Sequence, residues 1–349
     1  MESPKALGLG SSLMSVQELA KEPMLAIPQP YIRSEEEEPS IPSHGSDSLQ
    51  TIPVIDMNRL VFGQTDLELE NLHFACKEWG FFQLVNHGVE SSVVEKLRNE
   101  IQEFYKLPLE EKMIYKCKEG DAEGYGQTIL KNENQTVDWE DRFYMITNPI
   151  HRRKAHLIPE LPSSLREALE SYICELQKLG MTLLGMIGKA LNIGKGEMEE
   201  LFEDGLQSVR MTYYPPCPQP EKVMGRKAHT DAAGVTIILQ INGVQGLQVK
   251  RDGIWIPVNV LRDAFVVNVG DVLEIFSNGL YKSVEHRATV NSEKERISVA
   301  MFFNQNFQSE VGPAPTLLNP QNPPLFKRVG MESFFRDFYS RNLRANEES

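Results

Sequence analysis

The sequence contains few cysteines, no long apolar run and no cluster of basic residues. Its cysteines are scattered without a CxxC pair, at Cys76, Cys117, Cys174 and Cys217. They could form two disulfides, but a chain of this length does not need them, so reduced thiols are expected. No apolar stretch approaches the roughly 18 residues that span a membrane. The N-terminus also lacks the basic and apolar regions of a secretory signal, so a cytoplasmic protein is expected.

The sequence is short of positive charge. The formal net charge is −13, which disfavours binding to nucleic acid or to an anionic membrane surface. With 41% hydrophobic and 24% charged residues, the composition is that of an ordinary globular protein. At 349 residues, the chain is long enough to bury a substantial core. We therefore expect a partner among small molecules.

Composition and patterning divide the chain into four parts. Residues 1–50 are expected to be a peripheral extension with a short helix from Ser15 and an acidic, proline-containing linker at 34–42. A helix-rich part is expected at 51–207 and a strand-rich core at 208–310, followed by a C-terminal helical segment at 311–349. Because the two larger parts look mutually dependent, we interpret them as one catalytic unit.

Hydrophobic periodicity predicts which segments are helices and which are strands. Apolar residues recur at steps of three and four over 66–79, 93–105 and 164–191, which predicts helices, the last of them a long scaffold helix. Beyond residue 208, short strands are separated by turn residues. The strands are expected at 209–214, 235–241, 247–249, 255–258, 265–269, 272–276, 283–290 and 296–303. The pattern predicts a mixed α and β protein with a sandwich or jelly-roll core and flanking helices.

The main candidate site combines two histidines and an aspartate. His229 and Asp231 are two residues apart, so on a strand their side chains leave the same face. His286 lies in a later strand-like segment. Two imidazoles and one carboxylate form the facial triad of non-haem Fe(II) oxygenases, which leaves coordination positions open. Alone, a His-x-Asp pair is more often a surface hydrogen bond, so the prediction depends on the combination.

A second pair of residues supports the metal site. Arg296 and Ser298 follow His286 on what reads as its hairpin partner, and they too share one face. A planar guanidinium beside a hydroxyl suits bidentate capture of a carboxylate. The sequence therefore predicts a metal site with an anchor for an organic acid close to it.

These motifs resemble those of the plant 2-oxoglutarate- and Fe(II)-dependent dioxygenases of specialised metabolism, a family with a double-stranded β-helix (jelly-roll) core. Within it, the chain most resembles the subgroup of senescence-related-protein-like enzymes, alkaloid O-demethylases and norcoclaurine-synthase-like proteins. The resemblance covers about residues 50–340. It is carried by Ile52-Pro-Val-Ile-Asp56, Cys76-Lys-Glu-Trp-Gly-Phe-Phe-Gln-Leu-Val-Asn-His-Gly88, Tyr213-Tyr-Pro-Pro-Cys-Pro218, His229-Thr-Asp231, Asn268-Val-Gly-Asp271, Ser277-Asn-Gly279, Ser283-Val-Glu-His-Arg287 and Glu295-Arg-Ile-Ser298.

The resemblance implies a role for each matching residue. Iron would be bound by His229, Asp231 and His286, and 2-oxoglutarate by Arg296, Ser298, Tyr214 and Thr212. It also implies Fe(II) as the metal, 2-oxoglutarate and O2 as cosubstrates, ascorbate as reductant, and a monomer. Possible substrate contacts by family position are Phe302, Tyr125, Arg142 and Tyr144, although core packing is an equally good interpretation of each. If Arg142 faces the pocket, it would favour an anionic or phenolic substrate.

The chain departs from the family pattern at two places that bear on function. Thr212 stands where the family usually has asparagine, so cosubstrate affinity or pocket shape is expected to differ. The sequence also ends without the C-terminal extension expected from relatives. That ending predicts a more open pocket, or closure by another element.

The resulting expectation is a dioxygenase that hydroxylates or O-demethylates a small aromatic plant metabolite, such as a flavonoid, alkaloid or phenylpropanoid, releasing succinate and CO2. Two alternatives keep the fold. One is a non-oxidative condensing enzyme like the norcoclaurine-synthase-like proteins, and the other is a ligand-binding protein. Intact Arg296 and Ser298 argue against the first, and the complete triad argues against the second.

Overall fold

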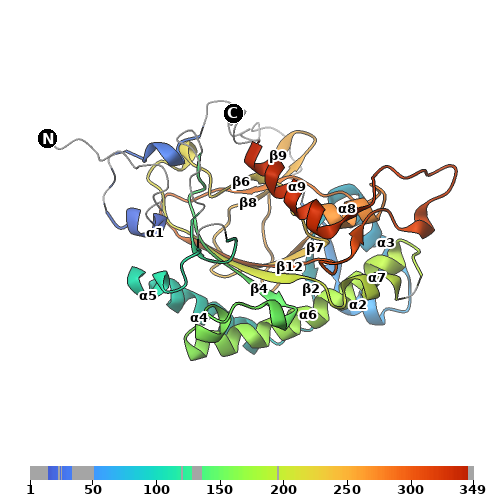
Figure 1. The fold of residues 1–349 in the computed structure, drawn as a ribbon, viewed down its shortest axis with the longest axis horizontal. Coiled ribbons are helices and arrows are strands. Elements are labelled where there is room, and N and C mark those ends of the chain that lie inside the picture. Colours follow the sequence, from blue (N-terminus) through green and yellow to red (C-terminus); the bar gives the residue numbers. More distant parts are fainter. Residues whose placement is uncertain are drawn as a thin grey trace.

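Two facing β-sheets with helices packed outside the larger one make up the fold (Figure 1). The computed structural model describes residues 15–22, 24, 26–33, 51–118, 121–127, 136–194 and 196–344. The expected linker at 34–42 lies outside these residues. The described strands are β1 (Val54–Asp56), β2 (Phe81–Val85), β3 (Gly124–Gly126), β4 (Asp141–Asn148), β5 (Gln207–Tyr214), β6 (Arg226–His229), β7 (Val235–Gln240), β8 (Leu247–Arg251), β9 (Ile254–Pro257), β10 (Phe265–Val269), β11 (His286–Ala288), β12 (Arg296–Phe303), β13 (Glu310–Val311) and β14 (Val329–Gly330).

The strand order is that of a jelly roll, as predicted. The large sheet runs β1-β2-β10-β7-β12-β5-β4-β3, and the small sheet runs β6-β11-β8-β9. Every pairing within them is antiparallel except that of β1 with β2. The small sheet lies over one face of the large sheet and leaves the other face to the helices (Figure 1).

The described helices are α1 (Val16–Leu19), α2 (Met57–Phe62), α3 (Leu67–Phe74), α4 (Ser91–Lys106), α5 (Leu109–Met113), α6 (Ser163–Ala190), α7 (Glu197–Phe202), α8 (Asp271–Phe276) and α9 (Met331–Arg344). The long helices α4 and α6 pack against each other along the outer face of the large sheet (Figure 1). A π-helical turn at Ala75–Trp79 continues α3. No helix among the described residues is long and apolar enough to cross a membrane.

The predicted scaffold helix is α6, which begins after Pro162. Its apolar stripe, which includes Leu169, Leu176 and Leu183, is buried in the core shared with α4 and the large sheet. Each fully buried leucine contributes roughly 2 kcal/mol to stability. A Cβ on Gly180 would lie 2.4 Å from the ring of Phe303, so this glycine lets α6 approach β12 closely.

The strands of the large sheet divide apolar from polar residues between their faces. In β12, Ile297, Val299, Met301 and Phe303 all belong to the core beneath the helices. Because side chains alternate along a strand, Arg296, Ser298, Ala300 and Phe302 take the opposite face, toward the small sheet. We call this second face of the large sheet the cavity face. The positions of the chemically active residues follow from it.

The N-terminal segment is not peripheral, contrary to the expectation for residues 1–50. Ser15 Oγ and the backbone N–H groups of Val16 and Gln17 donate to the buried carboxylate of Asp141, the backbone bonds both being 3.0 Å long. Val16 and Tyr31 are buried in a small apolar cluster together with Trp139 and Cys217. Sequence patterning missed this because the anchoring partner is more than a hundred residues away along the chain.

Two strand predictions were wrong. The segment predicted as a strand at 272–276 is helix α8, and the strand predicted at 283–290 is reduced to β11. A five-residue segment with four apolar residues cannot distinguish strand from helix by periodicity. Gly270 ends β10, and a Cβ there would lie 2.1 Å from the carbonyl oxygen of Ala233. The chain therefore turns at Gly270, and α8 buries Val272, Leu273 and Phe276 on one side.

Candidate metal centre

The three predicted ligands meet between the two sheets. His229 ends β6, Asp231 lies in the turn that follows, and His286 begins β11 and pairs directly with His229. One ligand atom from each lies within 4.8 Å of the others. Asp231 Oδ1 is 3.6 Å from Nε2 of His229 and 3.7 Å from Nε2 of His286. The folded chain therefore brings together the pattern of donors that the sequence predicted.

Hydrogen bonds orient both imidazoles toward the common centre. His229 Nδ1 lies 2.7 Å from the carbonyl oxygen of Lys227, and His286 Nδ1 lies 3.1 Å from that of Val284. A carbonyl only accepts, so each Nδ1 carries the proton and each Nε2 keeps a lone pair for a metal. Burial, followed by the charges of His286 and Arg226, lowers the pKa of His229 well below its usual value. The neutral ring is the form that binds metal ions.

The carboxylate of Asp231 is oriented in a similar way. Its Oδ2 accepts hydrogen bonds from Thr236 Oγ1 at 2.7 Å and from Asn268 Nδ2 at 2.9 Å, which leaves Oδ1 facing the histidines. Burial alone would raise the pKa of Asp231, but His286, His229 and these two donors together lower it. Asp231 is therefore an anionic ligand with its free oxygen directed at the metal position.

Sequence analysis missed Thr236 and Asn268 as residues of the site. Asn268 lies within β10 directly opposite Thr236 of β7. A fully buried asparagine inside an otherwise apolar strand was the available signal, because a buried amide requires hydrogen-bond partners.

A buried guanidinium lies on the cavity face of β12. Arg296 is 3% exposed, its Nη1 donates to Ser298 Oγ at 3.3 Å, and its guanidinium carbon lies 5.1 Å from the ring centre of Tyr214. None of the ion pairs among the described residues involves Arg296, and its Nε has no hydrogen-bond partner there. Burial lowers the pKa of Arg296. A buried, unpaired cation of this kind needs an anion.

Strand register arranges the cavity face in rows. Ser298 of β12 lies between Thr212 of β5 and Gln240 of β7, and Thr212 faces Arg142 of β4 on its other side. Two residues further along each strand, Tyr144, Arg210, Ala300 and Ile238 form the next row. The small side chain of Ala300 therefore lies between the row of Ser298 and the row in which Phe302 faces Thr236.

The structure separates the predicted substrate residues. Arg142, Tyr144 and Phe302 are half-buried on the cavity face. Tyr125 does not join them, because β3 pairs it with Phe143, whose side chain faces the helices. It is fully buried there, and its ring meets that of Phe143 edge-on at 6.3 Å between centroids. The prediction that Tyr125 contacts a substrate does not fit this position.

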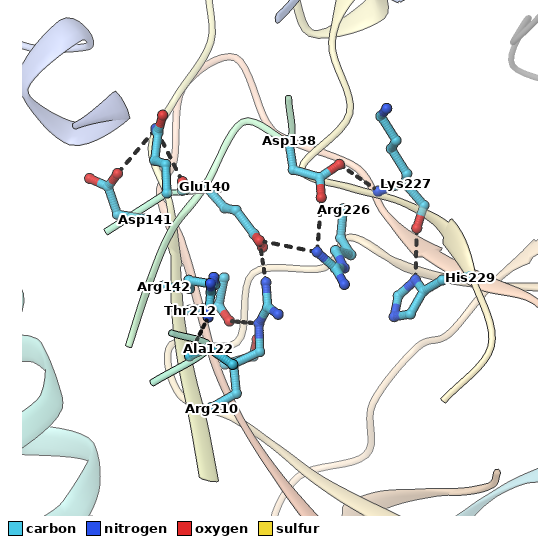
Figure 2. Close-up of polar contacts among 12 residues, drawn as sticks. Ala122, Asp138, Glu140, Asp141, Arg142, Arg210, Thr212, Arg226, Lys227 and His229 are labelled. Carbon is cyan, nitrogen blue, oxygen red and sulfur yellow. Dashed lines mark hydrogen bonds and ion pairs between the residues drawn. The ribbon is translucent and has the colours of Figure 1, made fainter. Parts of the chain in front are cut away.

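Thr212 has a polar partner on the same face. Its Oγ1 accepts a hydrogen bond from Arg210 Nε at 3.3 Å, and Arg210 Nη2 also pairs with Glu140. Figure 2 shows Glu140 between Arg210 and Arg226. Asp138 in turn binds Arg226 at 3.0 Å. This set of linked charges was not predicted, because it depends on the order of β4, β5 and β6.

The same network reaches one of the candidate ligands. Asp138 Oδ1 accepts the backbone N–H of Lys227 at 2.9 Å, and the carbonyl of Lys227 accepts from His229 Nδ1 at 2.7 Å (Figure 2). Asp138 therefore holds the peptide that orients the His229 ring.

The donor set decides which metals fit. Two neutral imidazoles and one carboxylate, with no thiolate, suit Fe(II) and leave room for further ligands. Thr236 and Asn268, which hold the carboxylate in place, are buried. Two other histidines have hydrogen-bond partners elsewhere in the fold: His73 Nδ1 lies 3.0 Å from Tyr281 Oη, and His87 Nε2 lies 3.0 Å from the carbonyl oxygen of Asp263.

Comparisons with known proteins identify relatives over nearly the whole chain. Residues 205–305 match the 2OG-Fe(II) oxygenase superfamily, and residues 52–164 match the family described as non-haem dioxygenase in morphine synthesis N-terminal. The chain is 50% identical over 329 residues to thebaine 6-O-demethylase of Papaver somniferum, which covers 92% of this chain and 90% of that protein. It is 47% identical over 345 residues to oxoglutarate-dependent flavonoid 7-O-demethylase 1 of Ocimum basilicum, with 98% and 91% covered. The crystal structure of JOX2 in complex with 2OG, Fe, and JA superposes with a TM-score of 0.86 at 33% identity, over 95% of this chain and 94% of that one.

Proposed function

Because the chain belongs to the 2OG-Fe(II) oxygenase superfamily, we propose that His229, Asp231 and His286 are the residues that bind its Fe(II). The enzyme is a 2-oxoglutarate-dependent dioxygenase. Held by these three residues, Fe(II) would supply the coupling of two reactions: the oxidative decarboxylation of 2-oxoglutarate by O2 to succinate and CO2, and the oxidation of a substrate C–H bond. The residues of the chain bind and orient 2-oxoglutarate and the substrate.

Arg296 is the residue that we assign to the distal carboxylate of 2-oxoglutarate. Its guanidinium is buried, unpaired among the described residues and flanked by the hydroxyl of Ser298 and the ring of Tyr214. This single observation carries the proposal, because a buried cation without an anion is unfavourable in the free protein. The aromatic face of Tyr214 supports the guanidinium by a cation–π contact at 5.1 Å.

Thr212 has a different task in this proposal. Its hydroxyl accepts from Arg210, so it links the cosubstrate side of the cavity face to the charged side chains of β4 and β5. We therefore expect the threonine, which stands in place of the family's usual asparagine, to affect substrate binding more than the binding of 2-oxoglutarate.

We propose O-demethylation of a methoxylated aromatic metabolite as the reaction. The relatives thebaine 6-O-demethylase and flavonoid 7-O-demethylase are named for this outcome and cover nearly the full chain. One oxygen atom of O2 enters the methyl C–H bond and the other enters succinate. The resulting hemiacetal loses formaldehyde and leaves a hydroxyl group. Half-buried Phe302 and Tyr144 on the cavity face supply aromatic surface for such a substrate.

The alternatives named from the sequence are less well supported. A non-oxidative condensing enzyme or a ligand-binding protein would have no need for a buried guanidinium aimed at a second organic acid. Together, the complete triad, its oriented donors and Arg296 favour the oxygenase.

We further propose a cytoplasmic monomer that acts on small molecules. The formal net charge of −13 supports the absence of nucleic acid partners. Light scattering coupled to gel filtration measures the mass of the particle, and a mass of about twice the 39.6 kDa of the chain would contradict the monomer.

The function is tested by the release of succinate and formaldehyde from air-saturated reactions that contain Fe(II), ascorbate and 2-oxoglutarate. A panel of methoxylated aromatics is compared with their unmethoxylated counterparts. We expect formaldehyde and succinate in equal amounts from the methoxylated compounds. The Asp231→Ala variant should form neither, whereas Asp66→Ala, which alters a 76% exposed side chain at the surface, should behave as the wild type. Failure of the wild type to bind 2-oxoglutarate in a direct titration would reject the proposed function.

A further inference from the structure

A second guanidinium without a carboxylate partner lies in the row of Ser298, next to the row of Arg296. Arg142 of β4 faces Thr212 of β5, which in turn faces Ser298 of β12. Neighbouring strands are about 4.8 Å apart, so Arg142 and Ser298 start roughly 10 Å from each other on the same face. A single molecule of 2-oxoglutarate held at Arg296 and the metal leaves Arg142 to the other ligand of the cavity.

The charges around Arg142 are already paired with one another. Glu140 forms ion pairs with Arg210 and, at 3.6 Å, with Arg226, and Asp138 forms an ion pair with Arg226 at 3.0 Å. Three guanidinium groups therefore share two carboxylates, and one positive charge is left over. Figure 2 shows the acids gathered around Arg210 and Arg226, while Arg142 lies to one side.

Arg142 keeps most of its donors free for a ligand. Its Nη1 donates to the carbonyl oxygen of Ala122 at 3.0 Å, and no carboxylate of the described residues lies within ion-pair distance. A guanidinium has five N–H groups, so a planar pair of donors remains. Burial, followed by the charge of Arg210, lowers the pKa of Arg142, although the more distant charge of Glu140 acts in the opposite direction. Its neighbour Asp141 does not help, because that carboxylate accepts hydrogen bonds from Ser15 and from the backbone of Val16.

We propose that Arg142 binds a carboxylate group of the substrate, so that the preferred substrates of this enzyme are methoxylated aromatic acids. The inference rests on the proposed function and specifies its substrate class. A planar guanidinium matches a carboxylate through two parallel hydrogen bonds, which a neutral ester cannot reproduce. Arg142 lies in the same row as Ser298 and one row from Tyr144, so it would fix the aromatic ring over the cavity face.

The test measures how strongly the enzyme prefers an acid to its methyl ester. The probes are para-methoxybenzoate, para-methoxycinnamate and para-methoxyphenylacetate, each beside its methyl ester. Dissociation constants are measured by anaerobic calorimetry on the protein loaded with Fe(II) and 2-oxoglutarate, and kcat/KM is measured by formaldehyde release. Loss of a charge-assisted pair corresponds to roughly 10- to 100-fold. We expect at least one acid to bind more tightly than its ester by about that factor.

Variants at Arg142 decide whether this residue causes the preference. In Arg142→Gln, the acid and its ester should bind with nearly equal affinity. In Arg142→Lys, which keeps the charge but loses the planar donor pair, the preference should fall several-fold and remain in favour of the acid. Arg262→Gln alters a side chain that is 95% exposed and should keep the full preference.

Two outcomes overturn the inference: no acid of the panel binds more tightly than its ester, or the preference is unchanged in the Arg142 variants. If the glutamine variant does not fold, the lysine variant decides by the same criterion. Binding of 2-oxoglutarate to the wild type is measured separately. A protein that binds 2-oxoglutarate but shows no preference for acids retains its proposed function and loses only the role of Arg142.

Discussion

Replacing Thr236 by valine tests whether the hydrogen bonds to Asp231 hold a metal ligand in place. Thr236 is 1% exposed, and its hydroxyl is one of two side-chain donors to Asp231 Oδ2, at 2.7 Å. Valine keeps the branched shape that suits a strand and removes only this donor. Asn268 would then be the single side chain that orients the carboxylate.

The size of the effect can be estimated from the geometry. A hydrogen bond to a charged group contributes about 1.5–3 kcal/mol. The substitution removes this hydrogen bond from the metal-free protein as well as from the metal-bound protein, because the carboxylate of Asp231 is charged in both. Only part of that energy therefore affects metal affinity. Loss of a residue that orients a ligand typically weakens metal binding by about 10- to 100-fold. We therefore expect binding in Thr236→Val to be weaker by about 10-fold, at the lower end of that range.

Cobalt(II) provides the measurement, because its visible absorption reports both occupancy and coordination geometry. Titration of the metal-free wild type, Thr236→Val and Asp231→Ala gives three affinities to compare. Thr182→Val is the matched control: that hydroxyl donates to the carbonyl of Lys178 at 2.9 Å on the exposed side of α6. Equal affinity and an equal spectrum for Thr236→Val and the wild type would refute the positioning role.

Three further perturbations follow from the structure. Arg296→Met should raise the KM for 2-oxoglutarate by roughly 10- to 100-fold, because it removes the charge-assisted bonds to the distal carboxylate, and an unchanged KM in a succinate assay would exclude that role. Gly180→Val should lower the free energy of unfolding in urea by about 1–3 kcal/mol, because a Cβ would lie 2.4 Å from the Phe303 ring, and undiminished stability would mean that α6 moves freely. Burial lowers the pKa of His87, whose Nδ1 accepts the N–H of Val89, so the unfolded chain binds the proton more readily. The wild type should therefore lose stability as pH falls below about 6.5, and His87→Gln should lose less over the same pH range. Thermal unfolding midpoints measured at each pH test this, and an equal dependence of the midpoint on pH in the two proteins would contradict it.

Part of the metal-centre pattern could be predicted because pairs of its residues are only two positions apart in the sequence. His229 and Asp231 are two residues apart, and although β6 ends at His229, their ligand atoms lie on one side as the spacing predicted. The same rule placed Arg296 and Ser298 together on one face of β12. The predicted convergence of His229, Asp231 and His286 is confirmed by the positions of their ligand atoms.

What could not be predicted depends on which strands are neighbours. Thr236 and Asn268 reach Asp231 only because β7 and β10 pair in one register. Glu140 meets Arg210 because β4 lies beside β5, and it meets Arg226 across the cavity. These residues are far apart in the chain and belong to no short motif, so no local pattern connects them. The segment at 272–276 was misjudged for a different reason, since a short and mainly apolar segment satisfies a strand and a buried helical turn equally well.

Tyr125 and Arg142 show the limit most clearly, because the sequence offered both as substrate contacts. Alternation along one strand places Arg142 and Tyr144 on a common face, and that much can be inferred from their spacing. It says nothing about Tyr125, which belongs to another strand. Its face is decided by the register of β3 against β4, where it pairs with Phe143 rather than with Arg142. A shift by one residue would exchange the two faces. The division between a core residue and a substrate contact is therefore set by strand pairing, which the glycines on both sides of Tyr125 do not reveal.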